Sequence, residues 1–84
     1  MIYKHWFKIE FEYDAYEDAI CFYVNYDNKL VKYKFDKEQE IFKELWSVNT
    51  PNISDILFYP NGNLVCMTHA NQLVAIGYID GKIL

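Results

Sequence analysis

The sequence contains no arginine: its eight basic residues are all lysines, and twelve acids bring the formal net charge to −4. The bidentate guanidinium fork with which proteins bind phosphate, carboxylate and guanine is therefore absent. An acidic balance also disfavours contact with nucleic acid and with anionic membranes. We therefore predict no direct binding to nucleic acid or to a membrane, and we expect a protein partner in preference to a small molecule.

Cysteine is scarce, with only Cys21 and Cys66, each inside an apolar stretch. Two cysteines do not make the disulfide framework of a small secreted domain, so both are predicted to be buried free thiols. The first thirteen residues lack the apolar segment of a signal peptide, and no apolar run approaches the ~18 residues of a membrane span. These absences predict a cytoplasmic protein.

Side chains able to carry catalysis are few and unfavourably spaced. The histidines are His5 and His69, and His69 lies three residues after Cys66 on a predicted strand, which places the two on opposite faces. Cysteines and histidines lack the paired spacing of zinc ligands, and the three glycines are scattered instead of forming a phosphate loop. We predict no catalytic residue, no metal site and no cofactor, hence no enzyme; the alternative is a small enzyme that uses His5 or His69.

Aromatic residues are abundant. Eight Tyr, six Phe and two Trp make up 19% of a chain of 84 residues, which is the length of one domain, predicted over residues 1–84. A domain this small buries only about 60 to 65% of the surface of its unfolded chain. Its core cannot absorb every tyrosine, so several are expected at the surface, where tyrosine favours interfaces.

The pattern of apolar and polar residues predicts strands along much of the chain. Residues 6–13 and 29–35 alternate in polarity, and residues 20–26 are rich in β-branched and aromatic side chains. Asp27 and Asn28 supply a two-residue turn, so the second and third of these strands are predicted to pair as a hairpin.

Residues 37–46 are predicted to form a helix. Asp36 is a good N-cap and Gln39 follows three residues later, which is a capping-box arrangement. The apolar residues that follow at helical spacing are Ile41, Phe42, Leu45 and Trp46. This helix is expected to pack its apolar stripe on the sheet.

Three more strands are predicted over residues 53–59, 64–70 and 73–79, with a hairpin turn at Asn61-Gly62. The predicted fold class is α+β: an antiparallel sheet of about six short strands with one helix, in the order β-β-β-α-β-β-β.

Acids gather at the end of the first predicted strand and in the loop after it. Five acids and no base occur within nine residues, on one strand face and its loop, with Tyr13 and Tyr16 between them. Such a patch can steer a basic partner electrostatically and hold it with aromatic anchors. The predicted contact residues are Glu10, Glu12, Asp14, Tyr16, Glu17 and Asp18. The alternative is a solvated face that prevents edge-to-edge aggregation.

Two resemblances point to one class of function. In length, acidity and abundance of Tyr, Asn and Lys without a catalytic motif, the whole chain resembles the small immunity proteins of bacterial toxin systems, which bind and block a cognate toxin, often a nuclease. Residues 72–80, QLVAIGYID, are similar to a strand in staphylococcal uracil-DNA glycosylase inhibitors, which are phage-type DNA mimics. No functional residue can be carried over from either family. Both resemblances imply an acidic protein inhibitor of an enzyme that handles nucleic acid.

The function expected from the sequence is stoichiometric inhibition, in which an immunity protein blocks a basic nuclease toxin through its acidic, tyrosine-flanked surface. One alternative is a phage-type DNA mimic that inhibits a DNA-processing or defence enzyme. Another is a self-associating structural module.

Overall fold

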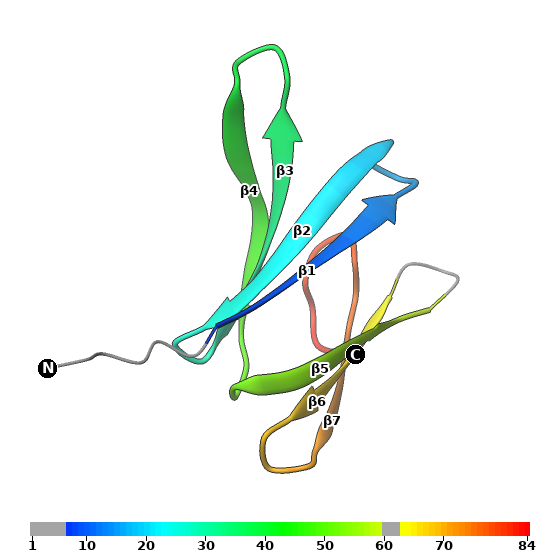
Figure 1. The fold of residues 1–84 in the computed structure, drawn as a ribbon. Coiled ribbons are helices and arrows are strands. Elements are labelled where there is room, and N and C mark those ends of the chain that lie inside the picture. The colour runs from blue at the N-terminus through cyan, green and yellow to red at the C-terminus, as the bar shows by residue number, and fades with distance from the viewer. Residues whose placement is uncertain (1–6, 60–62) are drawn as a thin grey trace, which may run out of the picture.

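The computed structural model of the protein describes residues 7–59 and 63–84. Within these residues the chain forms two antiparallel sheets whose strands are neighbours in sequence order (Figure 1). The strands of the first sheet are β1 (Phe7–Asp14), β2 (Ala19–Tyr26), β3 (Lys29–Asp36) and β4 (Ile41–Asn49). Those of the second sheet are β5 (Ile53–Phe58), β6 (Leu64–Thr68) and β7 (Leu73–Ile76). No part of the described chain is helical, and so no helix suited to crossing a membrane occurs there.

The α+β prediction is wrong, because residues 37–46 do not form a helix. Residues 37–40 form a turn, and β4 follows at once. The carboxylate of Asp36 accepts hydrogen bonds from the backbone N–H groups of Glu38 and Gln39, at 2.9 and 3.2 Å. An aspartate that caps a helix uses the same local bonds to close a turn. Glu40 then adopts a positive φ of 55°, which turns the chain into β4.

A β-bulge explains why β4 has helical spacing. Tyr33 pairs with Glu44 and Lys32 pairs with Trp46, so Leu45 has no partner in the register of β3. The extra residue moves the alternation of β4 by one position. Phe42 therefore faces outward beside Phe35, whereas Trp46 faces the core. Phe42 and Trp46 are therefore four residues apart, which is the spacing of one helix face, although they lie on opposite faces of a bulged strand.

The other predicted elements lie close to the observed ones. The hairpin of β2 and β3 is confirmed, and both turn residues have positive φ, 51° at Asp27 and 59° at Asn28. The three later strands are confirmed as β5, β6 and β7, although β6 and β7 end earlier than predicted. The predicted turn at Asn61-Gly62 lies outside the described residues.

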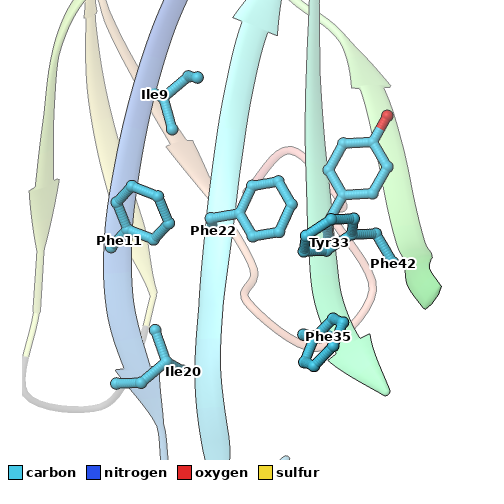
Figure 2. A pocket seen from close by; sticks show the side chains of 7 residues that line it. All are labelled: Ile9, Phe11, Ile20, Phe22, Tyr33, Phe35 and Phe42. Atoms are coloured by element: carbon cyan, nitrogen blue, oxygen red, sulfur yellow. The ribbon is translucent and has the colours of Figure 1, made fainter. Parts of the chain in front are cut away.

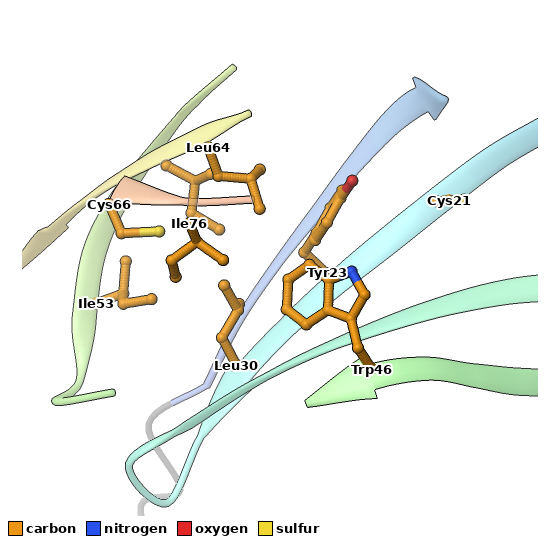
Figure 3. Close-up of a cluster of buried hydrophobic side chains, with 9 residues drawn as sticks. Cys21, Tyr23, Leu30, Trp46, Ile53, Leu64, Cys66 and Ile76 are labelled. Atoms are coloured by element: carbon orange, nitrogen blue, oxygen red, sulfur yellow. The ribbon is translucent and has the colours of Figure 1, made fainter. Parts of the chain in front are cut away.

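One apolar core lies between the two sheets (Figure 3). The first sheet contributes Cys21, Tyr23, Leu30 and Trp46, and the second contributes Ile53, Ile56, Leu64, Cys66 and Ile76. Cys21 and Cys66 are both free and buried, as predicted. The first sheet uses only one of its faces for this core, which leaves the opposite face for solvent or a partner.

The segment after β7 ties the two sheets together. The backbone carbonyl of Tyr78 accepts a hydrogen bond from the indole Nε1 of Trp46 at 2.9 Å and another from Nζ of Lys32 at 2.8 Å. Both donors belong to the first sheet, whereas Tyr78 follows the last strand of the second. The segment also folds back on β7, where Ile83 forms an isolated antiparallel bridge with Ile76.

Candidate functional site

The outward face of the first sheet carries a continuous group of apolar side chains. Cross-strand pairing places Phe11 opposite Phe22, Phe22 opposite Tyr33, and Phe35 opposite Phe42. Directly paired residues project on the same side of a sheet, so four strands contribute to one surface. Seven side chains line a shallow hollow of about 570 Å³ on it: Ile9, Phe11, Ile20, Phe22, Tyr33, Phe35 and Phe42 (Figure 2). We call these seven residues the open aromatic face.

Ring contacts hold this surface in one arrangement. The ring of Phe22 stacks on Tyr33 with centroids 5.1 Å apart, and it meets Phe42 edge-on at 5.2 Å. Phe11 lies 5.7 Å from Phe22 on the other side, so that Phe11, Phe22 and Tyr33 form a row across three strands (Figure 2). Aromatic pairs at these separations contribute about 0.5 to 1.5 kcal/mol each beyond their buried area. The surface is therefore ordered before any partner arrives.

The open aromatic face is exposed despite its apolar character. Phe11 and Phe42, on the edge strands β1 and β4, expose 67% and 63% of their surface. Phe22 and Tyr33 between them are half-buried and form the floor of the hollow. Contiguous exposed apolar patches mark sites where proteins bind other molecules.

None of the seven residues is charged, and the hydroxyl of Tyr33 is their one polar side-chain group. The face therefore offers no carboxylate, imidazole, amine or thiol group. It can remove water from an apolar partner surface and stack on aromatic side chains.

The predicted acidic contact residues lie elsewhere. Glu10, Glu12 and Asp14 alternate along β1 with the residues of the open aromatic face, so they project on the opposite side of the strand. Tyr16, Glu17 and Asp18 belong to the turn over residues 15–18. A single flat partner cannot contact both sides of β1 at once.

Two of the predicted contact acids are paired with lysines of β3. Asp14 is buried and forms an ion pair with Lys32, whose side chain is buried as well. Glu17 pairs with Lys34 at 3.2 Å and is partly exposed. Lys32 and Lys34 thus neutralise part of the predicted patch, and Asp14 is not accessible to a partner.

The other predicted residues lie nearer the surface. Glu10 and Glu12 are partly exposed on β1, whereas Tyr16 and Asp18 are exposed in the turn. Asp18 accepts a hydrogen bond from the hydroxyl of Tyr13, and this bond raises the pKa of the Tyr13 phenol. The structure therefore brings Tyr16 and Asp18 together at the tip of the β1–β2 hairpin.

The thiols are held in their protonated form. Burial raises the pKa of the Cys66 thiol to about 11, and burial is also the main cause of the raised pKa of Cys21. His69 is exposed, whereas Cys66 is buried in the core. Within residues 7–59 and 63–84, no group of three or more His, Cys, Asp or Glu residues is placed to hold a metal ion. His5 lies outside the described residues.

Alternation in polarity does not predict the open aromatic face, because it groups side chains by strand face without showing which face is covered. A signal was present in β2. Ile20 and Phe22 alternate with Cys21 and Tyr23, so this strand is apolar on both sides. A strand of that kind needs a covering layer on each face, and the second sheet covers only one.

Comparison with known proteins identifies no relative of this chain. No family model matches it, and no curated protein and no solved structure is significantly similar to it. The chemistry of the protein surface is therefore the basis for inferring a function.

Proposed function

We propose that this protein acts by binding another protein chain, without catalysing a reaction, and that the open aromatic face is its docking surface. The observation that carries the proposal is the exposure of an ordered group of phenylalanines on a sheet face that the second sheet does not cover. Interface cores are enriched in aromatic residues and depleted of charge, and this face has both properties.

The exposed rings on the edge strands would act as anchors. Full burial of an aromatic side chain removes roughly 150 to 250 Å² from water, and Phe11 still exposes 67% of its surface. Covering it would contribute roughly 2.5 to 4 kcal/mol by area, before the cost of association. Phe42 would contribute a similar amount, so these two residues are the expected hot spots.

Within this class, the finer function that we propose is stoichiometric inhibition of a nuclease toxin by an immunity protein in the cytoplasm. The acidic balance of the chain and its resemblance to immunity proteins support it. Tyr16 and Asp18 support it further, because both are exposed at one hairpin tip where a basic partner can reach them. A phage-type DNA mimic would use the same residues against a different enzyme.

Affinity capture with paired variants tests the docking surface. Phe11→Thr with Phe42→Thr removes two anchors while keeping residues that suit a strand. Glu12→Gln with Asp18→Asn removes acids outside that face. We expect the aromatic variant to lose a partner captured at 1:1. The acid variant should keep that partner at reduced affinity, because Asp18 is expected to contribute to binding a basic partner.

The opposite result, loss of the partner only in the acid variant, would move the binding site to the acidic side of β1. The identity of the partner decides the finer function. Recovery of a basic nuclease supports the inhibitor proposal, and recovery of a DNA-repair or restriction enzyme supports the DNA-mimic alternative.

A further inference from the structure

We infer that the protein chain covering the open aromatic face is a second copy of this one, and that two copies pair sheet on sheet around a two-fold axis. The inference rests on the proposal that this face docks a protein, and it names that protein. A nuclease would then have to bind outside the face, at the hairpin tip that exposes Tyr16 and Asp18. In such a dimer the same surface is used by both copies, as a two-fold interface requires.

The size of the face suits a dimer. Four strands spaced about 4.8 Å apart and eight residues long at about 3.3 Å per residue span roughly 500 Å². The exposed area of its side chains adds up to a similar value. Five of them expose between 41% and 67% of a surface of roughly 150 to 250 Å² each: Ile9, Phe11, Ile20, Phe35 and Phe42. Two copies would bury about 1,000 Å², which is the lower limit for a specific interface and typical of a dimer that dissociates on dilution. One copy alone exposes a patch near the upper limit for a soluble monomer.

Charge limits how two copies can pair through this face. Like copies repel when uncompensated charges of one sign meet, and the chain carries a net charge of −4. The seven residues of the face carry no charge. The ion pairs Lys43–Asp36 and Lys34–Glu17 involve strand residues that project on the other side of the sheet, whereas Glu44 lies opposite Tyr33 and projects on the same side as the face. Two copies therefore have to pair in an arrangement that keeps their Glu44 carboxylates apart.

The shape of the molecule also favours pairing through this face. The chain measures 38 × 35 × 16 Å, so its shortest dimension is less than half of either of the other two. Pairing across the open aromatic face would thicken this flat body and raise the fraction of buried surface, which is low in small domains. Packed sheets lie about 10 Å apart, either nearly aligned or crossed at right angles. Offset or crossed sheets allow Phe11 and Phe42, at the borders of one hollow, to enter the hollow of the other copy.

Sedimentation equilibrium over a range of about 1 to 100 μM tests the inference on the untagged full chain. We expect wild type to have twice the chain mass and to dissociate on dilution. The Phe11→Thr/Phe42→Thr variant should be monomeric, with a dissociation constant raised at least about 10,000-fold, because the dimer loses two anchors from each copy and each contributes about a factor of ten or more. Circular dichroism and thermal melting show whether this variant still folds.

A matched control comes from the outward face of the second sheet. Leu57 and Leu73 expose 58% and 67% of their surface, close to the values for Phe42 and Phe11, and they pair in register with Val65 and Met67. Leu57→Thr/Leu73→Thr therefore removes a similar exposed apolar area elsewhere. This variant should remain dimeric.

Three results would overturn the inference: a wild-type chain that is monomeric at 100 μM, a dimer that survives Phe11→Thr/Phe42→Thr, or a dimer lost only in the leucine control. These results leave the docking function separately testable. A monomeric wild type whose captured partner is lost in the aromatic variant keeps the proposed function and rejects only the second copy. A partner retained in that variant rejects the docking surface.

Discussion

The indole of Trp46 packs so closely on Gly81 that a β-carbon at position 81 would lie 2.5 Å from Cε3 of the ring. Gly81 also has a positive φ of 71°, a backbone conformation that residues other than glycine rarely adopt. Trp46 is further held by its hydrogen bond to the carbonyl of Tyr78. The segment after β7 can therefore pack on Trp46 because residue 81 is a glycine, which leaves room for the indole ring.

Gly81→Ala should therefore destabilise the protein by about 2 to 4 kcal/mol, since it combines overpacking with an unfavourable φ. Gly77→Ala is the matched control. Its β-carbon would have Asp80 Oδ1 as nearest neighbour, at 3.2 Å, and its φ is not in the left-handed region. Urea denaturation of both variants measures the difference, and a Gly81→Ala variant as stable as Gly77→Ala would contradict the close packing of Trp46.

The buried ion pair between Lys32 and Asp14 predicts a large cost when one partner is removed. Lys32→Met leaves a carboxylate buried without its ion-pair partner, and we expect a loss of about 3 to 5 kcal/mol. Lys32→Met combined with Asp14→Leu should recover part of that loss, because the charge is removed as well. In the exposed control pair, Lys82 lies 4.0 Å from Asp80, and Lys82→Met should change stability by less than about 0.5 kcal/mol. Equal losses at the two pairs would argue against burial of Lys32.

The raised pKa of Cys66 predicts a loss of stability at alkaline pH. The unfolded thiol has an ordinary pKa of 9.0, and the folded one a pKa of about 11. Between these values the unfolded chain binds fewer protons than the folded chain, so stability is complete below about pH 9 and falls as pH rises towards 11. Thermal melting of wild type and Cys66→Val across this range should show wild type losing on the order of 1 to 3 kcal/mol relative to the variant. Parallel pH profiles would contradict a desolvated thiol.

The turn over residues 37–40 predicts how the chain responds at Asp36. Asp36→Ala removes the two hydrogen bonds to Glu38 and Gln39 and the ion pair with Lys43, so we expect a lower free energy of unfolding in urea denaturation. Asp36→Asn keeps an oxygen acceptor and should lower the free energy of unfolding by less.

Far-ultraviolet circular dichroism of the wild-type protein should show sheet without a helical component. A clear helical signal would contradict β4 and favour a helix over residues 37–46.

The acidic residues illustrate what a one-dimensional pattern leaves open. Alternation along β1 correctly predicted that Glu10, Glu12 and Asp14 share a side, since the strand has a period of two. It did not predict that Asp14 would be buried on Lys32, because that contact joins residues eighteen positions apart. Contact with a partner stays a prediction for the exposed residues of the six predicted contact residues, which include Tyr16 and Asp18.

The sequence by itself determined the local features: the β2–β3 hairpin, whose turn residues Asp27 and Asn28 tolerate positive φ, and the burial of Cys21 and Cys66. Only the tertiary structure decided that residues 41–49 extend the first sheet as β4, because pairing with β3 and the bulge at Leu45 outweigh helical spacing. It also decided which face of that sheet the second sheet covers. Alternation groups side chains by face, but the choice of the covered face depends on packing between distant segments, and that choice leaves Phe11 and Phe42 exposed.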